Sequence, residues 1–227
     1  TGRPRLHRLS VLGDPFPDLA PPPAGTASVH IREHALPGNR WSVRCVLSDE
    51  HPDGCLLDDP IDTDGVYVLW RVGVDDEGRG VIRMNRTALG TSPPLWYVML
   101  PEADASRPAM TLVGFATDHL PVGTIITDPV FFMMPVESEE QVGAIRWWYL
   151  DGVVDEVYVD PKWRRRGIAT DLIYAVGAWQ AMHGHPVRIR SDGRRTELGA
   201  HFEAGARFPS RFAPITEIVR PMDPPEA

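Results

Sequence analysis

The stretch VVDEVYVDPKWRRRGIATDLI, residues 153–173, decides the fold because it runs from a strand through a turn into a helix. The β-branched residues of 153–159 predict the strand, and an apolar period of helical spacing follows the turn. The start of a helix leaves several backbone N–H groups unpaired, and the helix dipole makes that end attractive to anions. The stretch therefore predicts a phosphate pocket, where Gly167 and Ala169 let the phosphate approach the backbone and Arg164 donates from the side.

The helix after this turn is predicted to be amphipathic. Its apolar residues recur at helical spacing over 168–182, while Asp171 and Gln180 lie off the stripe. A glycine and a proline then end it, and the alternation of 186–190 predicts another strand. A strand, a crossover helix and a strand form a parallel unit by default.

Short strands and turns dominate the rest of the chain. Further strands are predicted at 6–12, 28–33, 42–47, 66–74, 80–85, 95–100, 110–116, 122–127, 146–150 and 212–220, with a short helix within 195–208. These elements predict an α+β chain with a mixed β-sheet and flanking helices. We divide it into a proline-rich, strand-containing N-terminal region (1–64), a main domain (65–220) and a tail (221–227).

Composition and charge exclude several classes of protein. The 227 residues are 43% hydrophobic, which is ample for a buried core, but no run of about 18 apolar residues could span a membrane. The N-terminus lacks a secretory signal, so the expected compartment is the cytoplasm. The net charge is −8, yet residues 162–211 carry +6, which leaves −14 elsewhere. This pattern indicates a local anion site on an acidic protein rather than a surface for nucleic acid.

The opening stretch resembles the acetyl-CoA-binding motif of the GNAT superfamily of N-acetyltransferases. Its signature of Arg or Gln, two residues, Gly, one residue, and Gly or Ala is met by Arg164, Gly167 and Ala169, and the likeness covers residues 145–212. The resemblance implies a GNAT-like sheet whose strand before the turn splays from the next, so that coenzyme A enters between them. The residues implied to hold acetyl-CoA are Val157, Tyr158, Val159, Arg164, Arg165, Arg166, Gly167, Ile168, Ala169 and Thr170.

The same resemblance implies a general base on the strand before the turn. Alternation along a regular strand predicts that Asp155 and Val157 share one face, while Glu156 and Tyr158 share the other. Asp155 is the first candidate for the base and Glu156 the second. The alternative for each carboxylate is a solvated or ion-paired residue at a strand edge.

The general acid of the family is a tyrosine in the short helix after the second strand. The stretch HFEAGARF places Phe202 at that position, or His201 on another alignment. His201 is therefore a candidate proton donor, and protonation by water or a complete loss of transfer stays open. Tyr158 and Tyr174 are further phenols of the matched region, and we expect Tyr174 in the core.

The resemblance predicts an acyl-CoA-dependent N-acetyltransferase, in which an amine attacks the thioester of acetyl-CoA directly and no metal takes part. The acidic remainder of the chain favours a cationic small molecule or peptide as the acceptor. Two alternatives stay open: a non-catalytic acyl-CoA-binding module, and an acyltransferase directed to nucleic acid or tRNA. No membrane partner is expected, and a homodimer stays open.

Overall fold

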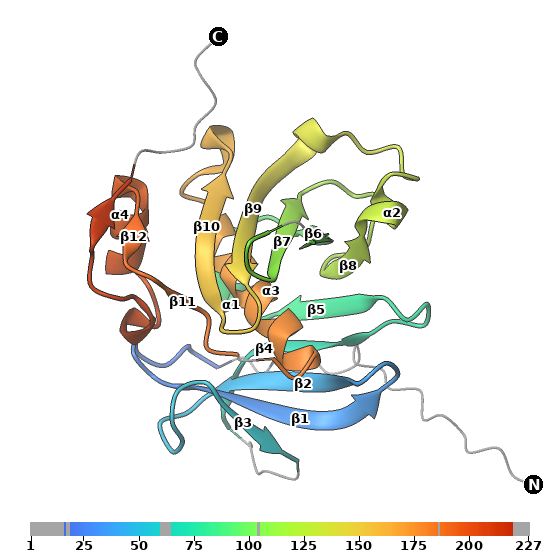
Figure 1. Cartoon of the computed structure of the whole chain (residues 1–227). Helices are drawn as coiled ribbons and strands as arrows, with labels where there is room; N and C mark the ends of the chain where they lie inside the picture. The colour runs from blue at the N-terminus through green and yellow to red at the C-terminus, as the bar shows by residue number, and fades with distance from the viewer. Residues whose placement is uncertain (1–15, 17–18, 60–64, 104, 186, 220–227) are drawn as a thin grey trace, which may run out of the picture.

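The centre of the molecule is one mixed sheet to which both halves of the chain contribute strands (Figure 1). This computed structural model describes residues 16, 19–59, 65–103, 105–185 and 187–219. Within these residues the sheet has eleven strands in the order β11-β10-β9-β7-β6-β8-β5-β4-β2-β1-β3. The strands are β1 (Ser28–Leu36), β2 (Arg40–Leu47), β3 (Cys55–Asp58), β4 (Tyr67–Val74), β5 (Gly80–Met84), β6 (Trp96–Glu102), β7 (Ala109–Phe115), β8 (Thr124–Thr127), β9 (Gln141–Trp148), β10 (Val153–Val159) and β11 (Arg190–Ser191).

Short and long helices flank this sheet. They are α1 (Arg86–Leu89), α2 (Asp128–Phe131), α3 (Ile168–Met182), α4 (Glu197–Ala204) and the 3-10 turns η1 (Ser138–Glu140), η2 (Pro161–Trp163) and η3 (Pro209–Arg211). A separate pair of short parallel strands, β12 (Arg194–Arg195) and β13 (Glu217–Ile218), lies beside α4. The prediction of an α+β fold with a mixed sheet and flanking helices is confirmed. The predicted strand at 6–12 and the tail at 221–227 lie outside the described residues.

Several strands differ from their predicted bounds, and the strand predicted at 212–220 is reduced to Glu217–Ile218. The strand predicted at 146–150 begins earlier, at Gln141, because η1 ends directly before it. The strand predicted at 186–190 is shorter and later, since only Arg190 and Ser191 pair with β10. Their neighbours, Val187 and Ile189, are buried against the core instead of extending the ladder.

The N-terminal strands continue the main sheet. β2 pairs with β4 in antiparallel register, with Val43 opposite Val72, so hydrogen bonding runs across the predicted boundary at residue 64. The boundary itself stays a prediction. The continuous sheet provides strands on both sides of the longest helix, α3.

Helix α3 is buried on nearly every side. It contacts β9 and β10 with one flank and β2 and β4 with another, as Figure 1 shows. Asp171 and Gln180, which were predicted to lie off the buried stripe, are 1% and 0% exposed. The prediction of an amphipathic helix is therefore wrong, because Ser92 and Tyr97 cover Asp171 on one side of the helix and Tyr149, just after β9, binds Gln180 on another. This packing fixes the N-terminus of α3 rigidly beside the end of β10.

A buried ion pair ties the C-terminal segment to the first strand of the sheet. The Arg211 guanidinium donates to both carboxylate oxygens of Asp53, at 2.6 and 2.9 Å, and also to the Ser28 hydroxyl. Ser28 lies at the start of β1, and its backbone N–H donates to Asp53 over 3.0 Å. The buried charge of Arg211 is thus balanced by a bidentate partner.

Candidate active site

The turn between β10 and α3 has a backbone conformation that only glycine fits. Gly167 caps the helix with φ at +83°, in the left-handed region. A Cβ at this position would lie 2.4 Å from the carbonyl oxygen of Leu89, a backbone atom that cannot swing away. Gly167 therefore lets the turn approach α1 closely while the helix begins in the next residue.

The same turn presents a row of unpaired backbone donors. Within the described part of the chain, no backbone N–H from Arg165 to Thr170 donates a hydrogen bond, and the first N–H to do so is that of Asp171, to Gly167 over 3.0 Å. Lys162, Arg165 and Arg166 are exposed around them. Open amides at a helix N-terminus, surrounded by cations, form a pocket suited to phosphate.

Arg164 contributes to the shape of this turn. Its Nε donates to the carbonyl oxygen of Val159 over 3.1 Å, which ties the turn back to the end of β10. The neighbouring Arg166 guanidinium lies 4.9 Å from the centre of the Trp163 ring. The arginines at 164 and 166 thus brace the loop as well as adding positive charge.

Strand β10 diverges from β11, as the resemblance implied. They pair over two residues only: Val153 and Val154, at the start of β10, lie opposite Arg190 and Ser191, which make up the whole of β11. Among the described residues no strand pairs with the β11 side of 155–159. This length of β10 leaves backbone groups open to an extended ligand that ends at the phosphate turn.

A β-bulge at Asp155 changes which side chains of β10 share a face. Val154 lies opposite Trp147 and Glu156 lies opposite Arg146, so Asp155 is an extra residue in the register. Directly opposed residues share a face, which places Glu156 beside Arg146. Asp155 also forms an ion pair with Arg146. The predicted alternation, with Asp155 and Glu156 on opposite faces, is therefore wrong.

The two carboxylates of the bulge differ in their partners. Asp155 lies between Arg146 and Arg194, whose Nη2 is 3.4 Å away, and Arg146 also binds Glu102 over 2.8 Å. Glu156 is partly buried and forms no hydrogen bond or ion pair with any described residue. Burial raises the pKa of Glu156, and the nearby charge of Asp155 raises it further. A partly dry, unpaired carboxylate is suited to proton transfer.

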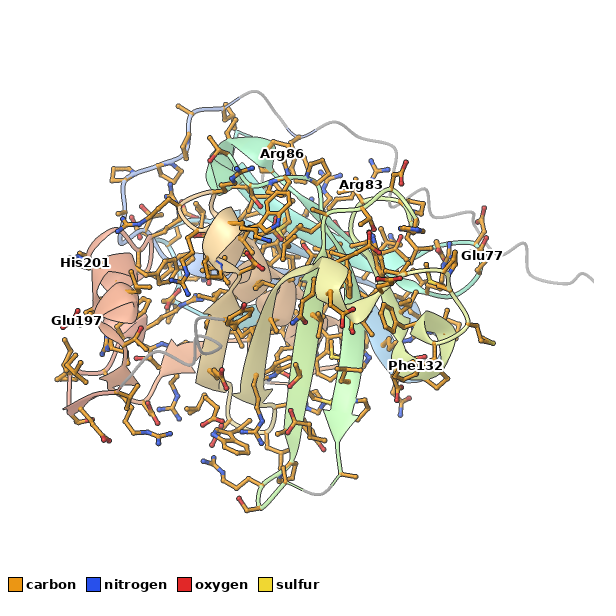
Figure 2. All side chains as sticks on the ribbon, turned by 90° about the horizontal axis from the view of Figure 1, so that it is seen from above. Glu77, Arg83, Arg86, Phe132, Glu197 and His201 are labelled. Atoms are coloured by element: carbon orange, nitrogen blue, oxygen red, sulfur yellow. The ribbon has the colours of Figure 1, made fainter. Side chains whose placement is uncertain are left out.

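The other predicted acid–base residues lie elsewhere. His201 is exposed on α4 at the outer edge of the molecule, next to Glu197 (Figure 2). Phe202 packs its ring against Phe212, with 6.1 Å between ring centres. The expectation that Tyr174 belongs to the core is confirmed, since it is 6% exposed and burial raises its pKa to about 12.

Sequence reasoning missed a buried polar cluster under the phosphate turn. Asp171, in the first turn of α3, accepts hydrogen bonds from the Tyr97 hydroxyl and, over 3.1 Å, from the Ser92 hydroxyl. Burial raises its pKa to about 6, against the effect of these donors and of nearby Arg86. Its only signal in the sequence was a polar residue inside an otherwise apolar helix.

Comparison with known proteins finds one family to which part of this chain is similar. Residues 92–188 match the model of the acetyltransferase (GNAT) family, a stretch that runs from the loop before β6 through β10 and α3. Residues 92–188 are therefore similar to a GNAT acetyltransferase domain. The match begins well before residue 145, where the motif-based likeness was placed, and it ends before α4. No curated protein and no solved structure matches the chain.

Two further features are absent from the described residues. They contain no group of three or more histidine, cysteine, aspartate or glutamate side chains arranged to hold a metal ion. They also contain no helix that is both long and apolar enough to cross a membrane.

Proposed function

We propose that this protein transfers an acetyl group from acetyl-CoA to an amine. One observation carries the proposal: the unpaired amides of Arg165 to Thr170 lie at the end of β10, the strand whose neighbour diverges. An extended ligand with a phosphate near one end fits this arrangement. Coenzyme A has that shape and charge, and its thioester supplies the activated acetyl group.

The binding roles follow from the groups that are open. The amides of the turn donate to the pyrophosphate, while Lys162, Arg165 and Arg166 add positive charge around it. The backbone of Val157 to Val159 holds the pantetheine and acyl part along the open edge of β10. This orients the thioester carbonyl toward the face on which Glu156 lies.

Proton transfer in this proposal begins at Glu156. Its carboxylate accepts a proton from the acceptor ammonium, and the neutral amine attacks the thioester carbonyl. The C–N bond forms, the C–S bond breaks, and the sulfur leaves as a thiolate that takes up a proton. Tyr158 lies two residues further along β10 on the side of Glu156, and we assign its hydroxyl the role of donor. Asp155, held by two arginines, positions the bulge.

A cationic acceptor is the substrate class that suits this site. Glu156 lacks an ion-pair partner among the described residues, so an ammonium group can approach it without displacing an arginine. Outside residues 162–211 the chain carries a net charge of −14. This negative charge raises the local concentration of cations around the protein.

A non-catalytic acyl-CoA-binding module is the second candidate. Two observations favour it: Phe202 occupies the position where the family has its tyrosine, and His201 lies exposed at the outer edge of α4. Such a module would bind coenzyme A without transferring its acyl group.

Calorimetry with acetyl-CoA tests the binding part of the proposal. We expect the wild type to bind and Gly167→Glu to lose binding, because the added carboxylate fills the phosphate turn with bulk and negative charge. Release of free thiol from acetyl-CoA with a panel of amines then tests transfer. Failure of the wild type to bind would refute the proposal, and binding without thiol release for any amine would favour the second candidate.

A further inference from the structure

The loop 85–92 lies against the phosphate turn although it is far away in the sequence. Its short helix α1 is capped by Asn85, whose side chain accepts from the backbone N–H of Thr87 over 3.1 Å. The Asn85 amide also donates to the carbonyl of Val68 on β4 over 3.1 Å. Apart from its last residue, Ser92, this loop precedes the family-matched residues, and nothing in the motif refers to it.

Two contacts fix the loop to the N-terminus of α3. The carbonyl oxygen of Leu89 occupies the space beside Gly167, where a Cβ would meet it at 2.4 Å. Three residues later, the Ser92 hydroxyl donates to the buried carboxylate of Asp171 over 3.1 Å. The loop therefore has one position relative to the open amides of the turn.

Arg86 is the cation that this arrangement holds at the turn. Its guanidinium donates to the carbonyl oxygen of Ser92, the same residue whose side chain binds Asp171. The residue is exposed, and the remaining donors of its fork make no hydrogen bond to any described residue. A guanidinium has five N–H donors in a planar fork, which matches the oxygens of a phosphate.

Balancing the negative charge of Asp171 does not explain the position of the Arg86 side chain. Asp171 already accepts hydrogen bonds from Ser92 and Tyr97, and Arg86 forms no hydrogen bond with it in the described structure. An arginine needed only to balance a buried carboxylate would be expected to bind that carboxylate directly. Arg86 instead uses a backbone carbonyl as its anchor and leaves most of its fork toward solvent.

We propose that Arg86 is a further phosphate-binding residue, which donates to a phosphate group of the coenzyme held at the N-terminus of α3. The inference rests on the proposed function, because it needs a phosphate-bearing ligand at the turn. It extends the binding site to a residue outside the motif and outside the family-matched residues. Arg86 touches the ligand and takes no part in proton transfer.

Calorimetric titration of the full chain with coenzyme A tests this inference. Arg86→Gln is expected to weaken binding tenfold or more, a loss typical of one charge-assisted hydrogen bond, and Arg86→Lys to recover part of it. Arg83→Gln on β5 is the matched control, since it removes the same charge three residues away and should change binding less than threefold (both residues are labelled in Figure 2). Added salt should weaken binding to the wild type more than to Arg86→Gln.

A merely structural role for Arg86 gives a different result. If Arg86 acts only through Asp171, Arg86→Gln will lower thermal stability while its affinity for coenzyme A and its salt dependence stay those of the wild type. That result, or an equal loss in Arg83→Gln, would overturn the inference. Failure of the proposed function is distinguishable from both results, because the wild type itself would then not bind coenzyme A.

Discussion

Asp155 and Glu156 are adjacent in the chain, yet both lie beside Arg146, because the bulge at Asp155 suspends the alternation of β10. Asp155 is bound to arginines, whereas Glu156 has no ion-pair partner among the described residues. The charge of Asp155 also helps to raise the pKa of Glu156. Asp155 thus holds the bulge in place and helps to raise the pKa of Glu156.

Glu156 should set the acidic limb of the pH profile. Its pKa is raised, so kcat/KM should fall as the pH drops through a value above that of an ordinary glutamate. Glu156→Gln should lose about 10²–10⁴-fold in kcat and lose this limb. Asp155→Asn removes a like charge and should move the limb to lower pH. Steady-state kinetics across pH checks both, and an unchanged limb in Glu156→Gln would exclude it as the base.

Gly167→Ala should destabilise the fold by more than its backbone conformation alone explains. A left-handed residue other than glycine costs about 1–2 kcal/mol, and the clash with Leu89 adds about 1–3 kcal/mol. Gly78→Ala is the matched control, because Gly78 has a similar φ of +78° with nothing within 4 Å of a Cβ. Urea denaturation compares the two free energies of unfolding. Equal losses of unfolding free energy in the two variants would mean that the turn shifts to accommodate the added methyl group and that the clash with Leu89 costs nothing.

Asp171 should make the stability of the protein depend on pH. Its pKa is about 6 in the folded state against an ordinary value of 3.8, so its protonated form is favoured by folding. The stability this contributes is fully present below about pH 4 and is lost as the pH rises through about 6; the shift corresponds to about 3 kcal/mol. Asp171→Asn should therefore destabilise the protein more, relative to wild type, at pH 4 than at pH 7. Denaturation at both pH values measures this, and a constant difference would contradict it.

Arg211→Met should cost about 3–5 kcal/mol of unfolding free energy, because it leaves Asp53 without its bidentate partner. Arg188→Met is the control: Arg188 is half exposed and lies 3.7 Å from the same carboxylate, so its loss should cost about 1 kcal/mol or less. The double variant of Arg211→Met with Asp53→Leu should lose less than the sum of the single changes. Additive losses would show that the pair does not act as a unit.

His201→Ala should leave kcat and KM for acetyl transfer within about twofold, because the side chain is exposed on α4 and forms no hydrogen bond or ion pair with any described residue. Tyr158→Phe should lower kcat by about tenfold or more if its hydroxyl protonates the leaving thiolate. The opposite pattern, with loss in His201→Ala alone, would assign the acid to α4.

Much of the secondary structure follows from local pattern. The hairpin of β4 and β5, the strand at 153–159 and the helix from Ile168 to Met182 lie where alternation, turn residues and helical period predicted them. The local sequence pattern gave the wrong bounds where packing against a neighbouring element set the length of a strand. The strand at Arg190 and Ser191 is short because the residues before it, Val187 and Ile189, are buried against the core instead of pairing with β10.

By itself, the sequence determined the strand, turn and helix around Gly167, since backbone preference and apolar period act within a few residues. It also determined that the turn is rich in cations on an acidic chain. Only the tertiary structure decided which carboxylate of β10 stays unpaired, because a bulge depends on the register with β9. Only the tertiary structure places Leu89, Ser92 and Arg86 at the start of α3. Contacts between residues some eighty positions apart depend on how the whole sheet encloses that helix.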